Sequence, residues 1–537
     1  MRKFGFPKLW IVVSAVFGCY VGSLVLPAQA QEFSKQVQVI RETTHDVSLP
    51  LRELAKMVPV QKHANREIEN HEPIVHIKQV GNGEDPVVQR VTLPKVATTN
   101  LLNFDGQGAD NLAPPDTEGA VGATQYVQWV NVEYNVYNKS TGAKILGPVQ
   151  GNAIWSGFAS EGCSSVNNGD PIVLYDKIAQ RWFFSQPNFN GPFAVCIAVS
   201  TSSDATGTYN RYAFAINPSN QFPDYPKWGV WPDAYYLAFH MFLNGGGQGD
   251  GVQACAVDRN AMLAGNAATM QCFTAGTKVQ LQTFLPADLD GTTPPPAGEP
   301  NTYITLGDDT AHLNLWQFHV DFVNPSNSTF KGPGALPVPP YSLICQSNFQ
   351  DIRSCIPQPS PGEGLDALGN RLMYRNAYRN FGDHESMVVS HVVKPGSGSS
   401  AVGAVRWYEI RNPKAPVLFQ SGTLQHPTIS IWMSSIAMDK AGDIALGLSA
   451  SSPTVKPSVA YLGRVPTDPP GTMESPDTVV LGTGVQEFTG NRWGDYSAMQ
   501  IDPTDDCTFW YTQEYIKTNG SFNWSTRINS FKFNNCH

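Results

Sequence analysis

Residues Gly169–Asp176 read GDPIVLYD, and after the short segment Lys177–Gln180 the chain continues as RWFF over Arg181–Phe184. Both runs are rich in β-branched and aromatic residues, which favours strands, and the segment between them suits a tight turn. The same order of turn residue, strand, turn and second strand returns at Trp432–Gly447 and at Gly494–Tyr511. This repetition predicts many antiparallel strands of one recurring kind.

Looser copies of the unit begin at Pro115, at Pro232, near Tyr303 and at Gly382. Together these are about seven starts, spaced by roughly 60 residues, whereas a four-stranded blade needs roughly 40 to 50, so long loops make up the difference. We therefore predict an all-β fold, namely a seven-bladed β-propeller. Six or eight blades stay open, and a pair of β-sandwiches is the alternative architecture.

The composition agrees with a β protein and excludes several functions. Charged residues make up 15% of the 537 residues, below the roughly 25% typical of soluble domains. Gly 47 and Pro 41 are too many turn formers for a long-helix protein. The net charge of −9, without a basic run, argues against a nucleic-acid partner.

The N-terminus has the features of a secretory signal. Arg2, Lys3 and Lys8 form a basic region, Leu9–Leu26 is largely apolar, and Ala28–Ala30 offers a small-x-small cleavage site. Cleavage there takes the net charge from −9 to −12. No later stretch is apolar enough to span a bilayer, so we predict a secreted, periplasmic or cell-surface protein, with an uncleaved anchor as the alternative.

The rest of the chain divides into two parts. Residues 31–100 are charged and mildly helical, without cysteine or tryptophan, which fits a propeptide or a surface-wrapping arm. Residues 101–537 form the predicted propeller domain, and the proline-rich breaks inside it are interpreted as loops.

Eight cysteines remain once Cys19 leaves with the signal. An even number in an exported chain indicates disulfides, and close C-x-x-C pairs, which a thiolate metal site would favour, are absent from the sequence. Sequence neighbours lie at hairpin-like separations, so we predict the pairs Cys163–Cys196, Cys255–Cys272, Cys345–Cys355 and Cys507–Cys536.

Five aspartates occupy similar positions early in the repeats: Asp116, Asp170, Asp233, Asp383 and Asp495. Loops converge at the mouth of a propeller channel, so these residues would form an acidic ring there. Clustered carboxylates could bind Ca²⁺ or hold one acid protonated for general acid–base chemistry. The alternative is that each aspartate caps its own strand turn.

Asp383, His384 and Glu385 form the densest polar group, and Arg375 and Arg379 lie just before it. The histidine could act as a general base, and the arginines could bind an acidic sugar or another carboxylate. Neighbouring residues of a strand point to opposite faces, so a structural hydrogen-bond network is the competing hypothesis.

Arg492, Asp495 and Tyr496 form a similar candidate catalytic group in the last repeat. Calcium is a possible cofactor, because Asp288–Gly291 and Asp105–Asp110 resemble cation-binding turns, although neither completes a calcium-loop spacing.

Tryptophans in strands, including Trp182 and Trp510, are expected in the core between blades. Those beside turn residues, Trp228, Trp231 and Trp493, could instead stack on a sugar.

Several of these motifs resemble a widespread family of exported bacterial propeller-like proteins of undefined function. The resemblance covers about residues 100–535 and is carried by Asn103–Gly106, Trp231–Tyr236, Leu285–Gly291, Tyr378–Ser386 and Arg492–Ser497.

A more distant likeness links the turns at Asp176, Asp439 and Asp502 to the Asp-box turns of sialidase-type propellers. Their spacing to glycine or tryptophan differs from the Ser-x-Asp-x-Gly-x-x-Trp pattern. This likeness therefore implies a shared fold and not sialidase chemistry.

The sequence leaves three functional hypotheses. The first is a monomeric exported propeller that binds a glycan or an extracellular protein at its channel mouth. The second is a glycan-active hydrolase or lyase that uses the two polar groups across the channel. The third is a purely structural surface protein with a filled channel.

Overall fold

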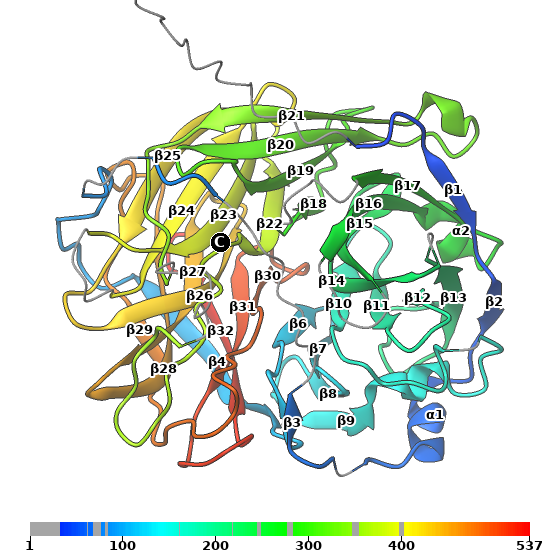
Figure 1. The fold of residues 1–537 in the computed structure, drawn as a ribbon, viewed down its shortest axis with the longest axis horizontal. Helices are drawn as coiled ribbons and strands as arrows, with labels where there is room; N and C mark the ends of the chain where they lie inside the picture. Colours follow the sequence, from blue (N-terminus) through cyan, green and yellow to red (C-terminus); the bar gives the residue numbers. More distant parts are fainter. Residues whose placement is uncertain are drawn as a thin grey trace, which may run out of the picture.

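The computed structural model describes residues 33–61, 63–67, 77–80, 84–160, 162–216, 219–243, 249–275, 283–345, 354–396 and 402–537. The predicted signal segment 1–30 lies outside these residues. The described chain is nearly all β-strand, as predicted (Figure 1).

The strands fall into sets of four consecutive antiparallel neighbours. The first set is β6 (Glu118–Val121), β7 (Gln125–Val130), β8 (Glu133–Asn138) and β9 (Lys144–Gln150). The second is β10 (Ile172–Asp176), β11 (Arg181–Asn188), β12 (Ala194–Ser200) and β13 (Tyr209–Ala215). The third is β14 (Gln221–Val230), β15 (Ala234–Leu243), β16 (Gly249–Asp258) and β17 (Thr269–Ala275).

The pattern continues along the second half of the chain. The fourth set is β18 (Leu285–Leu289), β19 (Asn301–Leu306), β20 (His312–His319) and β21 (Thr329–Pro337). The fifth is β22 (Met373–Asn380), β23 (Glu385–Val393), β24 (Ala404–Arg411) and β25 (Val417–Leu424). The sixth is β26 (Ser430–Met438), β27 (Ile444–Ser452), β28 (Val455–Arg464) and β29 (Asp477–Val480).

The last set joins the two ends of the chain. It contains β30 (Ala498–Ile501), β31 (Thr508–Tyr515) and β32 (Ser525–Phe533), and its fourth strand is the early strand β4 (Thr98–Gly108), which pairs with β32. Because this set takes strands from both ends of the chain, it closes the circle of sets.

The first strands of the sets form a ring around the centre (Figure 1). Each first strand contacts the first strand of the next set, and β30 contacts β6. β18 and β22 also pair directly, in parallel. This radial arrangement of antiparallel sheets confirms the β-propeller prediction. The blade number of seven stays a prediction, with which the sets in the described residues are consistent.

The segment before β4 packs on the outside of the propeller. β1 (Gln38–Arg41) pairs with β17, and β2 (Thr44–Val47) pairs with β13. Helix α1 (Leu51–Met57) buries Leu51 and Leu54, and β3 (Arg66–Glu67) pairs with β5 (Leu112–Ala113). The remaining helix is α2 (Arg259–Ala264), and η1 (Gly151–Trp155) and η2 (Pro325–Asn327) are short 3-10 turns.

The core lies between the faces of neighbouring sheets. A sheet inside the ring is covered on both faces, so a strand can be buried on both; β12, for example, is buried along its whole length. Every tryptophan in the described residues is at most 2% exposed. Burial of Trp228, Trp231 and Trp493 excludes the sugar-stacking role considered for them.

The four disulfides are those predicted: Cys163–Cys196, Cys255–Cys272, Cys345–Cys355 and Cys507–Cys536. Among the described residues, no helix is both long and apolar enough to cross a membrane.

Candidate functional site

The channel has two mouths with different residues. We call the mouth at which the first strands begin the start mouth, and the other the end mouth. Asp116, Asp170 and Asp495 each precede a first strand, namely β6, β10 and β30. Lys177 and Asp290 each follow a first strand, and they form an ion pair.

The three start-mouth aspartates lie close together. The Asp495 backbone N–H donates to Asp116 Oδ1 at 3.2 Å, and the Tyr225 N–H donates to Asp170 Oδ2 at 2.9 Å. Arg492 Nη2 donates to both Asp495 oxygens, at 2.8 and 2.7 Å. Three of the five residues of the predicted acidic ring are therefore brought together.

Burial of this cluster shifts the pKa values of Asp116 and Lys227. Burial raises the pKa of Asp116 well above its usual range, and the Asp495 and Asp170 carboxylates raise it further. Burial lowers the pKa of Lys227 to about 8, against the opposing effect of Asp170 and Asp116. The Tyr225 ring lies 3.5 Å from Lys227 Nζ. Burial therefore favours the neutral form of Asp116 and makes the proton of Lys227 easier to lose.

The other two aspartates of the predicted ring lie elsewhere. Asp233 precedes β15 and Asp383 precedes β23, which are second strands of their sets. A second strand runs antiparallel to the first, so its start faces the end mouth. The prediction that all five aspartates form one acidic ring is wrong. The same pattern of turn residue and strand occurs before first strands and before second strands, which start at opposite mouths.

Inside the channel, Arg375 is fully buried, and each of its three side-chain nitrogens donates a hydrogen bond. Nη1 donates to Asp288 Oδ2 at 2.9 Å, Nη2 to Asp290 Oδ2, and Nε to the Met499 carbonyl at 3.1 Å. Lys177 Nζ donates to Asp290 Oδ1. These cations occupy the carboxylate oxygens that a calcium ion would need in the Asp288–Gly291 turn.

Arg379 is also fully engaged. It donates to both Asp506 oxygens at 2.7 Å and to the Met438 carbonyl at 3.1 Å. Arg375 and Arg379, predicted to bind a ligand, therefore hold structural ion pairs, because their donors already have acceptors within the protein. In the second candidate calcium turn, Asp105 pairs with Lys517 and Arg527.

The two predicted catalytic groups lie at opposite mouths. Asp383 and His384 occupy the turn after β22, where His384 Nδ1 lies 2.7 Å from Asp383 Oδ1. Glu385 accepts from the Tyr378 hydroxyl at 2.6 Å. Tyr496 precedes β30, and its hydroxyl donates to the Pro171 carbonyl at 3.0 Å. The convergence across the channel that the hydrolase hypothesis requires is therefore not present.

A pocket of about 260 Å³ lies beside the end mouth, between the fifth and sixth sets. We call it the Arg411 pocket; its lining includes Phe381, His384, Glu409, Arg411, Phe419 and Arg464. The His384 ring stacks on Phe381, with 4.8 Å between centroids and 16° between planes. The Arg411 guanidinium lies 3.4 Å from the Phe419 centroid. Of the residues predicted for the site, His384 is in this pocket.

A second pocket, of about 460 Å³, lies between β25 and β28 beneath residues 89–92. Its lining mixes aliphatic side chains, such as Leu448 and Leu462, with polar ones, such as Arg90 and His426. Among the described residues, this lining contains no phenylalanine, tyrosine or tryptophan, whereas the Arg411 pocket combines Phe381 and Phe419 with its charged groups. The Arg411 pocket is therefore the better candidate for a ligand with both apolar and polar faces.

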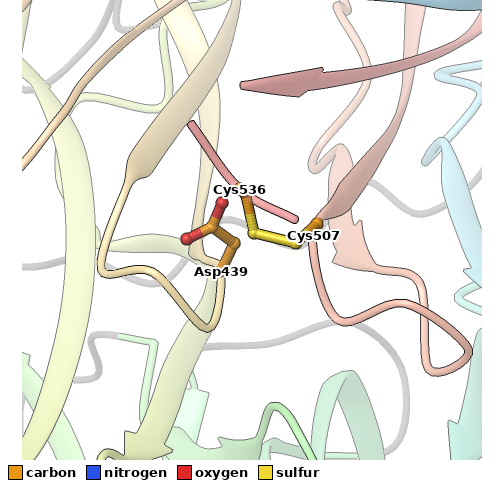
Figure 2. A group of neighbouring side chains, drawn as sticks. All are labelled: Asp439, Cys507 and Cys536. Atoms are coloured by element: carbon orange, nitrogen blue, oxygen red, sulfur yellow. A yellow bond between two sulfur atoms is a disulfide. The ribbon is translucent and has the colours of Figure 1, made fainter. Parts of the chain in front are cut away.

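In the described part of the chain, Asp439, Cys507 and Cys536 form a group with the spacing of metal ligands (Figure 2). The two cysteine sulfurs are bonded to each other. Because metal binding by cysteine requires free thiolates, this group is a packed disulfide beside a carboxyl group and not a metal site.

Asp439 provides a test of the pH dependence of stability. Burial, followed by the nearby Asp443 carboxylate, raises the pKa of Asp439 to about 8. The folded pKa lies above the unfolded value near 4, so this contribution to stability is complete below about pH 4 and is lost as the pH rises through about 8. Asp439→Asn mimics the protonated form, and we expect it to raise the free energy of unfolding by more at pH 8.5 than at pH 5.

Urea unfolding of both proteins at pH 5 and pH 8.5 measures this difference. Asp321→Asn, at an exposed turn, is the control and should not show the same gain at high pH. An Asp439→Asn variant with the same pH profile as the unmodified protein would contradict the assignment.

The sheets and their channel of paired charges define a β-propeller with a polar pocket at the end mouth. No family model matches the chain, and no curated protein matches it. It is similar to a solved neuraminidase-like protein from a little yellow-shouldered bat isolate, with 8% identity, coverage of 70% of this chain and 97% of that one, and a TM-score of 0.33.

Two further solved structures are similar to the chain. The phage phi92 endosialidase has 8% identity, coverage of 82% of this chain and 69% of that one, and a TM-score of 0.32. An endo-arabinase from Bacteroides thetaiotaomicron has 13% identity, coverage of 59% and 95%, and a TM-score of 0.25. Likenesses this distant carry no argument about function.

Proposed function

We propose that this protein is an exported β-propeller that binds a glycan in the Arg411 pocket. The observation that carries the proposal is the combination, in one pocket beside the end mouth, of aromatic rings with charged hydrogen-bonding groups. Phe419 is 52% exposed, and the side chains of His384 and Arg411 are 25% and 28% exposed. Sugars bind to such sites through their apolar faces and their hydroxyl groups.

Binding is favoured over catalysis because the charged side chains in the channel form ion pairs with one another. Arg375, Lys177, Asp288 and Asp290 are all buried and paired. Residues committed in this way stabilise the ring of first strands and are not free to act on a substrate.

A glycan hydrolase or lyase is the second candidate, and the raised pKa of Asp116 beside Asp170 favours it. Asp116 is only 1% exposed, so this function requires the start mouth to open. Shortened or unsaturated products that disappear with Asp116→Asn would support it.

Export is part of the proposal for two reasons. The four disulfides need an oxidising compartment to form. Residues 1–30 have the pattern of a cleaved signal.

The proposal predicts that protein from residue 31 onward is retained on at least one member of a panel of bacterial and plant polysaccharides. Phe419→Ala should weaken this binding by roughly 5- to 10-fold, since an aromatic contact contributes roughly 1 kcal/mol. Affinity electrophoresis with soluble polysaccharides measures the change.

Phe488→Ala is the matched control, because Phe488 is also exposed (83%) but lies in the segment before β30, at the start mouth. Its binding should equal that of the unmodified protein. Equal losses in both variants, or a panel without any retained glycan, would overturn the proposed site.

A further inference from the structure

The donors of Arg411 are held in place but only partly used. Nε donates to Glu409 Oε1 at 2.8 Å, and the guanidinium plane is supported by the Phe419 ring. In the described part of the chain, Nη1 and Nη2 have no hydrogen-bond acceptor. The outer edge of this guanidinium therefore presents unused N–H groups at a pocket wall.

Arg464, which also lines the pocket, is held by the protein itself. Its Nη1 donates to Gln420 Oε1, and its Nη2 donates to the Asp468 carbonyl at 2.9 Å. Arg464 is only 3% exposed, and its Nε, which has no partner among the described residues, is closed off from solvent. A ligand in the pocket would therefore find its free guanidinium donors on Arg411 and not on Arg464.

The carboxylates of the pocket already accept hydrogen bonds from the protein. Glu409 Oε1 accepts from Ser386 and Arg411, and its Oε2 accepts from Gln420 Nε2 at 2.6 Å. Asp468 Oδ2 accepts from the Val465 N–H at 2.9 Å. Both oxygens of Glu409 are thus committed to the protein, whereas Nη1 and Nη2 of Arg411 are free to donate to a ligand.

We infer that the Arg411 pocket binds a sugar ring that carries a carboxylate, such as a hexuronic acid residue of an acidic polysaccharide. A planar carboxylate matches two parallel N–H groups of a guanidinium edge. The volume of about 260 Å³ lies below the roughly 300–1,000 Å³ of pockets for drug-sized ligands and suits a single ring. The inference rests on the proposed function and names the class of glycan.

The test compares two ligands that differ only at C6, methyl glucuronide with its carboxylate and methyl glucoside with its hydroxymethyl group. Ligand-observed NMR gives the dissociation constant of each. We expect the unmodified protein to prefer the glucuronide by at least 10-fold, and this preference to fall as salt is raised. Arg411→Gln should reduce the preference to less than 3-fold, mainly because the affinity for the glucuronide falls.

Two controls keep the result interpretable. Arg527→Gln removes a partly exposed arginine that binds Asp105 on another face and should keep the full preference. Arg411→Lys keeps the charge without the planar edge and should give an intermediate preference even if the glutamine variant folds poorly.

The possible outcomes separate the inference from the proposed function. Equal affinity of the unmodified protein for both sugars, or a preference that survives in Arg411→Gln, overturns the inference. Binding of a neutral panel glycan that depends on Phe419, without binding of the glucuronide, also overturns it and leaves the proposed function standing. If no panel glycan binds at all, both are overturned.

Discussion

Replacing Arg375 by methionine is expected to lower the free energy of unfolding by roughly 3–5 kcal/mol. The side chain is fully buried and donates to Asp288 and Asp290, which are themselves no more than 2% exposed. Removing the guanidinium leaves Asp288 without its charged partner and leaves Asp290 with Lys177 alone. An uncompensated buried charge is among the largest single destabilising effects known in proteins.

Urea unfolding of the purified variants measures this loss. The control is Arg90→Met, which breaks the pair of Arg90 Nη2 with Glu84 at 2.8 Å, in which both side chains are more than 60% exposed. An exposed pair contributes about 0–1 kcal/mol. If Arg375→Met costs no more than Arg90→Met, then Arg375 does not hold the channel together.

Combining Arg375→Met with Asp288→Asn and Asp290→Asn should recover much of the lost stability. The two asparagines remove the buried negative charges that the arginine had compensated. Recovery would show that the cost comes from unpaired charge rather than from a cavity. Glycan binding by the Arg375→Met variant should be unchanged, since its donors face the channel and not the Arg411 pocket.

The second large effect concerns the disulfides. Cys163 and Cys196 are 33 residues apart, whereas Cys345 and Cys355 are 10 residues apart. The chain-entropy relation predicts losses of about 3.7 and about 2.7 kcal/mol on removing the first and the second bridge. The longer loop costs more because its bridge removes more freedom from the unfolded chain.

Double Cys→Ala variants of each pair, unfolded in urea at pH 7, measure the two losses. The Cys163 and Cys196 variant should unfold at the lower urea concentration. A greater loss on removing the Cys345–Cys355 bridge would contradict the entropic account. The comparison is internal to one protein, so differences in expression or purity do not decide it.

Much of the fold follows from local sequence. The β-branched and aromatic residues of Gly169–Asp176 and the tight turn to Arg181 correspond to β10 and β11. Disulfide pairing was also predictable, because each bridge joins cysteines that follow one another in the chain. Closure by β4 was not predictable, since Thr98–Gly108 pairs with a strand more than 400 residues later.

The candidate site was predicted less well, for two physical reasons. Asp233 and Asp383 share the local sequence pattern of Asp116. Only the direction of the strand that follows each aspartate decides at which mouth it lies. The Arg411 pocket is built from segments on two neighbouring sheets, around His384, Arg411 and Arg464. These segments have no common motif, because the packing of the sheets brings them together. His384 was found through its acidic neighbours, and no comparable signal marks Arg411.

The most direct test of the central claim is a crystal structure of the protein soaked with the tightest-binding glycan of the panel. We expect one sugar residue in the Arg411 pocket, in contact with Phe419 and with its acceptor oxygens on Arg411 Nη1 and Nη2. A sugar bound instead at the start mouth against Asp495, or in the second pocket beside residues 89–92, would contradict the account.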